Sequence, residues 1–507
     1  MALPTAIYTT QQVRDLDDHA IERLGIPGYT LMKRAGESAL RILRTRWPMA
    51  HEIVIVCGGG NNGGDGYVMA RFAQAAGLTV RVLAAVPPAE LRGDALRACE
   101  DFMTRAGESG VQPFHPAALA SGEVIVDAVL GTGLKGAVRE SMEPVLRAIN
   151  AAGRPVFALD IPSGLSSDTG LPLGDAVRAD STISFVGLKA GLFLGDGPEY
   201  TGTLFFDDLE VTPPATPDFL PKLTRILECE IREALPRRPR NAHKGSFGQV
   251  LIIGGGPGMS GAARLAGEAA LRVGAGLVTV AAAPESALAV ASGRPELMVH
   301  GVDDAAQLHP LLERADVIAL GPGLGRSDWA RRMLAAALDW PGPLVVDADA
   351  LNLIAEQPPV ARRNWILTPH PGEAARLLSH PGANATATNA AVTNAQVQAD
   401  RVGALNQLVH RYGGVCVLKG AGTLIGTSGQ PPAICERGNP GMAAPGMGDV
   451  LTGAIAGLLA QIEDPWTAAR VGVLVHAMAG DAEARQGERG VLASDVAREL
   501  RTWVNLR

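Results

Sequence analysis

Polar side chains stand at the ends of three apolar runs in the first half of the chain, and their types suit a cation. Asn62 follows the run EIVIVC, Asp127 closes EVIVD, and Asp160 and Ser163 follow RPVFAL. The carboxyl ends of strands in an open parallel sheet share one crevice, so we expect these four side chains to converge there. Their amide, carboxylate and hydroxyl oxygens are hard donors, suited to an alkali or alkaline-earth cation and poorly suited to zinc. The alternative for any one of them is a helix or turn cap.

A second set of residues that could do chemistry lies in the segment GNPGMAAPGMGDVLTGAIAGLLAQ. Gly446, Met447 and Gly448 precede a long apolar helix, so their N–H groups can form an anion hole, and Asp449 lies in the first turn. An acid beside an anion hole can take the proton from a hydroxyl group that attacks a terminal phosphate. The alternative is that Asp449 only stabilises the helix dipole.

The elements that must position the first set are strands followed by glycine-rich loops. The loop GGGNNGGDG, residues 58–66, separates a strand ending at Cys57 from a helix expected to begin near Tyr67. Free N–H groups at such a junction favour phosphate. A dinucleotide-dependent dehydrogenase would carry an acid about 20 residues further on. The segment LAAVPPAE around Val86 has no acid closing the strand, which disfavours a redox cofactor here. The fingerprint-like GPGMSG, residues 256–261, is a lone and weak match.

The composition indicates a globular protein with more than one domain. The chain has 507 residues, which is more than one hydrophobic core ordinarily contains. With 47% hydrophobic and 19% charged residues, its composition excludes a disordered chain. The net charge of −7 provides no basic footprint for nucleic acid or an anionic membrane. The five cysteines lack paired spacing, and neither a leader pattern nor a membrane span is evident. We therefore expect a cytoplasmic protein.

The segment 212–245, in which proline recurs, divides the chain into two halves of similar rhythm. EIVIVCG, LTVRVLAA, EVIVDAVLG and RPVFALDIP precede it, and GQVLIIGGG, GLVTVAAAP, ADVIALGPG and PLVVDAD follow it. Apolar strands alternating with helices predict parallel sheets covered on both faces. We expect two α/β domains, residues 1–222 and 223–507.

The motifs NNGGDG, VDAVLGTGLKG and DIPSGLSSDTG, in this order, resemble the NAD(P)H-hydrate epimerase domain over about residues 1–215. The resemblance implies a Rossmann-like three-layer sandwich in which the dinucleotide is a substrate, damaged by water added at C6 of the nicotinamide ring. By motif position, the substrate would contact two loops and potassium would be bound by Asn62, Asp127 and Ser163. The substrate loops comprise Asn61, Asn62, Gly63, Gly64 and Asp65, and Gly131, Thr132, Gly133, Leu134, Lys135, Gly136 and Ala137.

Asp160 is the candidate acid–base residue of this domain, and it would also contact the substrate. Interconverting the R and S hydrates moves a proton on or off oxygen, whether the hydroxyl leaves and returns or the ring opens and closes. A partly desolvated carboxylate can do both jobs. Lys189, in FVGLKAGLF, has two open interpretations, a phosphate contact or a side chain covering the rim.

The segments HKGSFGQVLIIGG, LGPGLGRSD, VVDADALNL, TPHPGEAARLL and VLKGAGTLI, followed by GMGD, resemble the ADP-dependent NAD(P)H-hydrate dehydratase, a ribokinase-like fold, over about residues 235–505. Fused in this order, the halves resemble the bifunctional NAD(P)H-hydrate repair enzymes. The resemblance implies that ADP binds at Lys419, Gly420, Ala421, Gly422, Thr423 and Gly448. The hydrated nicotinamide would lie near Ala262, Gly323, His370 and Asp449.

The implied chemistry removes water by phosphorylation. Hydroxide leaves poorly, whereas a phosphate ester leaves as an anion. Phosphoryl transfer from ADP to the C6 hydroxyl, with Asp449 as catalytic base, would let the ring nitrogen expel phosphate and restore NAD(P)H, with AMP as the other product. Magnesium is expected from nucleotide chemistry. The expected partners are NADHX, NADPHX, ADP and further copies of the chain, with no nucleic acid and no membrane.

Alternatives remain at particular residues and for the whole chain. His370 lies between two prolines and could be a turn residue with a packed ring. Asp347 and Asp349 could orient loops, and we leave them out of the catalytic set. Pro445 stands where the family often has glycine, and it supplies no N–H to the anion hole. The rival function is a ribokinase-like small-molecule kinase fused to a non-catalytic Rossmann-like binding module.

Overall fold

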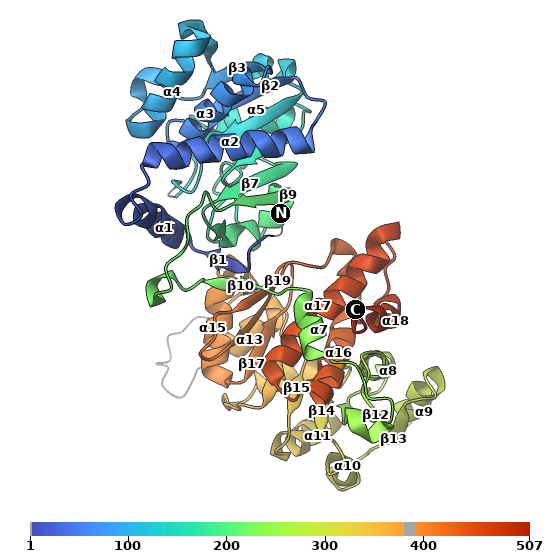
Figure 1. The fold of residues 1–507 in the computed structure, drawn as a ribbon. Helices are drawn as coiled ribbons and strands as arrows, with labels where there is room; N and C mark the ends of the chain where they lie inside the picture. The colour runs from blue at the N-terminus through green and yellow to red at the C-terminus, as the bar shows by residue number, and fades with distance from the viewer. Residues whose placement is uncertain (1–2, 135, 380–390, 507) are drawn as a thin grey trace. The chain divides into compact units, whose positions relative to one another are not determined.

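The chain folds into two compact units, residues Met1–Leu223 and Thr224–Arg507. The computed structural model describes residues 3–134, 136–379 and 391–506 (Figure 1). No helix within these ranges is long and apolar enough to cross a membrane.

The N-terminal unit is built on a seven-stranded parallel sheet with the order β4-β3-β2-β5-β6-β7-β9. The strands are β2 (Glu52–Cys57), β3 (Thr79–Ala84), β4 (Val111–Pro113), β5 (Val124–Ala128), β6 (Val156–Leu159), β7 (Ser181–Phe185) and β9 (Thr203–Asp207). Successive strands run outward in opposite directions from β2 and β5. The topology therefore places a switch point, where open α/β sheets bind ligands, between these two strands.

Helices cover both faces of this sheet, which confirms the predicted three-layer sandwich. One apolar cluster joins the sheet to the first four helices, and a second joins the opposite face to α5. The helices are α1 (Thr10–Glu22), α2 (Gly28–Arg46), α3 (Asn61–Ala75), α4 (Gly93–Ala106), α5 (Glu143–Ala151) and α6 (Gly197–Thr201). A short parallel pair, β1 (Ala6–Tyr8) with β8 (Leu188–Lys189), lies outside the seven-stranded order.

The C-terminal unit contains a mixed sheet in the order β13-β12-β11-β14-β15-β16-β17-β18-β19-β10. The strands are β10 (Leu223–Arg225), β11 (Gln249–Ile253), β12 (Leu277–Ala282), β13 (Met298–Gly301), β14 (Val317–Leu320), β15 (Leu344–Val346), β16 (Trp365–Leu367), β17 (Val415–Leu418), β18 (Thr423–Thr427) and β19 (Ala433–Cys435). Parallel pairing was predicted throughout and is found for most pairs. The exceptions are the antiparallel contacts of β18 with β17 and β19, because connections this short cannot make a crossover.

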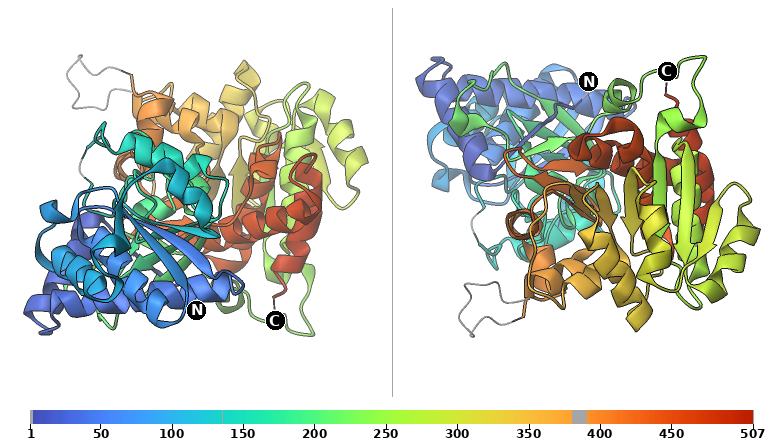
Figure 2. Two further views of the ribbon diagram at one scale, coloured as in Figure 1. Left: turned by 90° about the horizontal axis from the view of Figure 1, so that it is seen from above. Right: turned by 90° about the horizontal axis from the view of Figure 1, so that it is seen from below.

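The helices that complete this unit include two that are apolar nearly all round. Most residues of α16 and α17 are buried, as expected for helices enclosed in a core, and Figure 2 shows them, in red, against the strands. The helices are α7 (Cys229–Ala234), α8 (Ser260–Arg272), α9 (Pro284–Gly293), α10 (Ala305–Leu312), α11 (Asp328–Asp339), α12 (Ala348–Ile354), α13 (Pro371–Ser379), α14 (Asn394–Ala399), α15 (Arg401–Tyr412), α16 (Met447–Ile462), α17 (Pro465–Glu483) and α18 (Ala493–Trp503).

Candidate active sites

The glycine-rich segment 58–66 is mostly helix, which corrects the prediction that the helix begins near Tyr67. Helix α3 starts at Asn61, with Gly60 as its N-cap. A Cβ atom on Gly63 would lie 2.1 Å from the carbonyl oxygen of Gly58, and one on Gly66 would lie 2.8 Å from Cys57 Sγ. Glycine is therefore needed here for close approach of the helix to β2. That requirement outweighs its poor helix propensity.

Asp127 and Ser163 meet at the carboxyl end of β5, as predicted. The Asp127 carboxylate is completely buried. Its Oδ1 lies 2.6 Å from Ser163 Oγ, and its Oδ2 accepts a hydrogen bond from the Ser163 N–H at 2.8 Å. Burial raises the pKa of Asp127 to about 6, against the lowering effect of these hydrogen bonds. The described residues place no cationic side chain on this carboxylate, which leaves it suited to an added cation.

Asn62 lies near the same crevice with an unsatisfied side chain. It is only 7% exposed, and neither its amide nitrogen nor its amide oxygen has a hydrogen-bond partner among the described residues. A Cβ atom built on Gly131 would lie 3.1 Å from Asn62 Cβ and 3.4 Å from Asp160 Oδ2. Asn62 and Asp160 therefore flank the start of the second predicted substrate loop. A buried amide without partners points to a ligand or ion at this position.

Asp160 follows β6 and forms an ion pair with Lys189. Its backbone is left-handed, with φ of 66°, a strained conformation for a residue other than glycine and one that clusters at functional sites. The Lys189 side chain is completely buried and also donates hydrogen bonds to Ser184 Oγ at 3.0 Å and the Phe185 carbonyl at 2.9 Å. Lys189 is therefore a buried partner that holds the Asp160 carboxylate in place. Its burial fits neither of the two predicted roles, a phosphate contact or a side chain covering the rim.

Two further carboxyl groups share this electrostatic environment. Burial raises the pKa of Asp65 well above its ordinary range, and the charges of Asp160 and Asp17 add to the increase. Burial likewise raises the pKa of Asp17, in α1, to about 6, while Lys189 opposes the shift. The crevice thus contains an ion-paired carboxylate together with carboxyl groups that can hold a proton near neutral pH.

The remaining predicted substrate positions of this unit lie in the α3 turn and the loop after β5. Asn61 is exposed and Gly64 is buried in α3. The Thr132 carbonyl accepts a hydrogen bond from Arg14 of α1 at 2.6 Å, which ties the loop to this helix. Gly133, Leu134, Gly136 and Ala137 also lie in this loop, and Lys135 lies outside the described residues.

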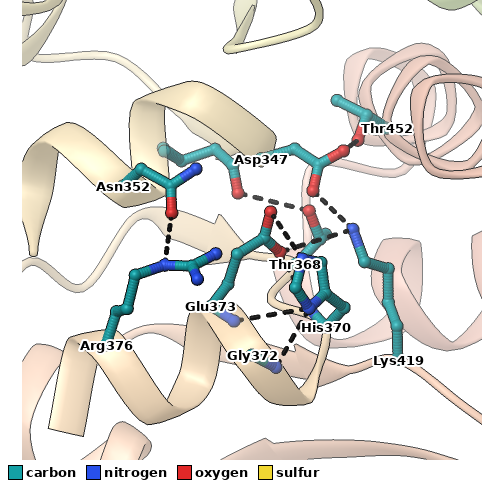
Figure 3. Close-up of polar contacts among 10 residues, drawn as sticks. Asp347, Asn352, Thr368, His370, Gly372, Glu373, Arg376, Lys419 and Thr452 are labelled. Carbon is teal, nitrogen blue, oxygen red and sulfur yellow. Dashed lines mark hydrogen bonds and ion pairs between the residues drawn. The ribbon is translucent and has the colours of Figure 1, made fainter. Parts of the chain in front are cut away.

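The centre of the C-terminal site is an ion pair between Lys419 and Asp347. Asp347 follows β15 and is 1% exposed; its Oδ1 lies 2.6 Å from Lys419 Nζ, and its Oδ2 accepts a hydrogen bond from Thr452 at 2.7 Å (Figure 3). Burial favours the neutral amine, but Asp347 and Glu373 hold the pKa of Lys419 above its ordinary value. Asp347 was not predicted to be catalytic, and in the structure its carboxylate holds the Lys419 ammonium group in place.

His370 and Glu373 form the second side of this site. Glu373 Oε2 accepts a hydrogen bond from the backbone N–H of His370 at 2.8 Å, and His370 Nδ1 accepts one from the backbone N–H of Gly372 at 3.0 Å (Figure 3). Burial, with Lys419 and Arg376, lowers the pKa of His370, which favours the neutral imidazole. Because Nδ1 accepts a hydrogen bond, the neutral ring carries its hydrogen on Nε2, which lies 3.3 Å from Glu373 Oε1. The imidazole caps α13 yet is half exposed, so it is not the fully packed ring of the alternative.

Glu373 is a site residue that sequence analysis missed. Burial raises its pKa to about 7, with Asp347 adding to the shift and Lys419 opposing it. Its carboxylate also lies 3.9 Å from Lys419 Nζ. The signal was present in TPHPGE, because a glutamate three residues after a helix-capping residue is typical of a capping box.

The first turn of α16 presents free N–H groups and a carboxyl group, as predicted. Gly446 is the N-cap, with φ of 85°, and the described residues provide no acceptor for the N–H groups of Met447, Gly448 and Asp449. Burial raises the pKa of Asp449 to about 7, and Asp347 adds to the shift. A Cβ atom on Gly448 would lie 3.3 Å from Lys419 Nζ. The anion hole and the lysine are therefore neighbours, the arrangement that stabilises a phosphoryl group in transfer.

Ala262 and Gly323, predicted to flank the nicotinamide, lie side by side. Ala262 is in the first turn of α8 and Gly323 follows β14, and a Cβ atom built on Gly323 would lie 3.0 Å from that of Ala262. Residues 419–422 connect β17 to β18, which begins at Thr423, and Gly420 and Ala421 are exposed. The Lys419 N–H donates to the Pro369 carbonyl at 2.9 Å, which joins this loop to the segment that carries His370.

Comparisons with known proteins cover both units. A family model described as NAD(P)H-hydrate dehydratase matches residues 250–502, and one described as YjeF-related protein N-terminus matches residues 28–191. The C-terminal half is similar to the crystal structure of a ribokinase-like superfamily protein from Enterococcus faecalis, with 30% identity, a TM-score of 0.50, and coverage of 56% of this chain and 95% of that chain. This likeness confirms the ribokinase-like fold.

Full-length relatives carry one shared description. The bifunctional NAD(P)H-hydrate repair enzyme Nnr of Coxiella burnetii is 48% identical and covers 99% of this chain and 100% of its own length. The enzyme of the same name from Escherichia coli is 41% identical, over 100% of this chain and 95% of its own length. The chain belongs to the family of bifunctional NAD(P)H-hydrate repair enzymes.

Proposed function

We propose that the chain repairs hydrated NADH and NADPH with two activities. The domain of residues 1–222 interconverts the R and S hydrates, and the domain of residues 223–507 dehydrates the S hydrate to NAD(P)H at the expense of ADP. The observation that carries the proposal is the 48% identity to a bifunctional repair enzyme over essentially the whole of both chains. An epimerase that feeds the dehydratase explains why the two are joined, because the R form would otherwise accumulate.

In the epimerase, Asp160 is proposed as the acid–base residue at the hydroxyl-bearing carbon. Its carboxylate is supported by a buried ammonium group and remains 15% exposed toward the crevice. Asp65, with its raised pKa, is a nearby group that can supply a proton. The substrate would lie between the first turn of α3, residues 61–65, and the loop 131–137.

Potassium is proposed to bind at Asn62, Asp127 and Ser163. The orphaned amide of Asn62 and the buried carboxylate of Asp127 fit such an ion, since both offer hard oxygen donors that lack a cationic partner among the described residues. The ion would supply positive charge close to a negatively charged substrate. Measuring epimerase activity in potassium and in sodium salts at equal ionic strength tests this assignment.

In the dehydratase, Asp449 is proposed to take the proton from the C6 hydroxyl group as its oxygen bonds to the terminal phosphorus of ADP. The bond to the AMP leaving oxygen breaks, and the lone pair of the ring nitrogen then expels inorganic phosphate from C6, which leaves an iminium ion. Loss of a proton from C5 to the solvent or to the released phosphate restores the C5–C6 double bond of NAD(P)H. Lys419 and the free N–H groups of α16 neutralise the charge on the transferred phosphoryl group. His370, Ala262 and Gly323 are proposed to border the nicotinamide, and residues 419–423 with Gly448 the ADP.

Magnesium is proposed to arrive with the nucleotide. Within the described ranges, no three His, Cys, Asp or Glu side chains are grouped as a metal site. Magnesium commonly keeps several waters and binds through one or two carboxylates and substrate phosphates. Such a mode fits a site that offers the Glu373 carboxyl group but no preformed cage.

Chromatography of the R and S hydrates incubated with the protein, with and without ADP, tests the whole proposal. We expect interconversion without ADP, and loss of both isomers with formation of NAD(P)H, AMP and phosphate when ADP is present. A stable phosphorylated product made from ATP would instead indicate the small-molecule kinase. The homo-oligomeric state and cytoplasmic location stay predictions, which light scattering and cell fractionation would test.

A further inference from the structure

Arg401 is a buried cation with no role in the chemistry described above. It is the first residue of α15 and is 4% exposed. Its guanidinium donates hydrogen bonds to the carbonyls of Leu418 at 3.2 Å and Gly422 at 3.1 Å, and it lies 3.5 Å from that of Lys419. A fourth contact joins it to Gln398 Oε1 at 3.0 Å. Arg401 thus binds both ends of the loop 419–422.

The backbone of this loop is divided into an acceptor side and a donor side. Arg401 contacts two of its carbonyls, those of Lys419 and Gly422, together with the Leu418 carbonyl at the end of β17. The Gly420 carbonyl accepts a hydrogen bond from Thr423 Oγ1 at 2.9 Å. In the part of the chain that the structure describes, the N–H groups of Gly420, Ala421 and Gly422 have no acceptor. Gly420 and Ala421 are exposed. Successive free N–H groups in an exposed turn form an anion-binding concavity.

Arginine and glycine fit each other closely at this point. Gly420 has φ of 137°, and a Cβ atom there would lie 2.7 Å from Arg401 Nη1. The guanidinium presents several donors in a rigid plane, so it can hold carbonyls at both ends of the loop at once, whereas a lysine would offer one small donor group. Burial lowers the pKa of Arg401 to about 10, which leaves it charged at neutral pH.

We propose that Arg401 is a positioning residue for the nucleotide: by holding the loop carbonyls inward, it keeps the N–H groups of residues 420–422 free to bind oxygen atoms of ADP. Arg401 itself does not touch the nucleotide. This role rests on the proposed ADP-dependent activity, and it makes the loop geometry, rather than the Lys419 side chain alone, a determinant of ADP affinity.

The test uses the full-length chain with R401M and R401K, and R411M as a matched control. Arg411 lies on the same helix and also donates to backbone carbonyls, those of Leu377 and Leu378 at 2.9 and 3.0 Å. We expect R401M to raise the KM and calorimetric Kd for ADP about tenfold or more, from the loss of several charge-assisted hydrogen bonds. R401K should raise them less, and R411M should leave them within about twofold.

Two further measurements on the same variants distinguish a positioning role from a general loss of structure. The KM for the S hydrate and the epimerase rate of the same chain should stay within about twofold in all three variants, because neither uses this loop. Equal increases in the KM for ADP and for the hydrate would overturn the inference, as would an unchanged Kd for ADP in R401K and R401M. If R401M does not fold, R401K decides. A wild-type chain that binds no ADP would instead overturn the proposed dehydratase function.

Discussion

The two sites are both built on a lysine–aspartate ion pair at the end of a strand, but they present opposite partners to their crevices. In the N-terminal site the lysine, Lys189, is completely buried and the aspartate, Asp160, is 15% exposed. In the C-terminal site Asp347 is 1% exposed and Lys419 is 18% exposed. The same pair thus presents a carboxylate in one unit and an ammonium group in the other.

This inversion matches the chemistry that each site needs. A carboxylate supported by a buried cation is suited to moving a proton at the C6 oxygen. An ammonium group supported by a buried carboxylate is suited to the negative charge of a phosphoryl group. In the C-terminal site the proposed acid–base residue is a different one, Asp449, whose pKa burial raises to about 7.

The largest expected effect is that of D160N, which removes the carboxylate presented by the first pair. We expect epimerisation to fall at least about 10³-fold, within the range contributed by a general acid–base group. Dehydration of the S hydrate by the same chain should stay within about twofold, because the second pair is untouched. Chromatography of R and S hydrates measures both rates, and loss of the two activities together would contradict separate sites.

The expected effect of K419M is smaller, and it breaks the second pair from its exposed side. We expect the kcat of dehydration to fall about 10²-fold or more, as for the loss of one electrostatic contact to the transferring group. The chain should also lose about 3 kcal/mol of stability, because Asp347 is left buried without its cation. Steady-state kinetics and denaturant unfolding measure these effects. An unchanged epimerase rate is the control, and an unchanged kcat would remove Lys419 from the phosphoryl site.

The sequence was sufficient to predict which polar residues lie at the ends of strands, but not which charged residues pair with one another. Asp127 and Ser163 meet as expected, because each follows an apolar run whose place in a parallel sheet can be recognised from its pattern. Lys419 and Asp347 are 72 residues apart, and their strands β15 and β17 are separated by β16. That contact depends on strand order, which a single sequence does not specify.

The prediction for the start of α3 was wrong for a related reason. Six glycines in residues 58–66 suggest a loop when each residue is considered alone. The helix nevertheless includes Gly63, Gly64 and Gly66, because it packs so closely on neighbouring backbone and side chains that other residues would clash. This constraint arises from tertiary contacts, so local propensity could not reveal it.

The pH dependence of the two activities would sharpen the comparison between them. Asp449 must be ionised to act as a base, and burial raises its pKa to about 7. The kcat/KM of dehydration should therefore fall by about tenfold per pH unit below pH 7 and level off above it. Because Glu373 has a pKa of about 7 as well, the observed value belongs to the coupled groups. E373Q is the control: it should keep the acid limb, and loss of that limb would transfer the base role to Glu373.

The smallest expected effect is that of P445G, which tests whether the anion hole of the second site is complete. Pro445 is exposed and precedes Gly446, the N-cap of α16, so the amide that proline lacks lies outside the first helical turn. The free N–H groups of Met447, Gly448 and Asp449 remain available without it. We expect P445G to change the KM for ADP by less than about twofold, and any loss of stability to come from the greater freedom of glycine in the unfolded chain. A much lower KM for ADP in P445G would mean that the anion hole extends one residue before the helix and that proline weakens phosphate binding there.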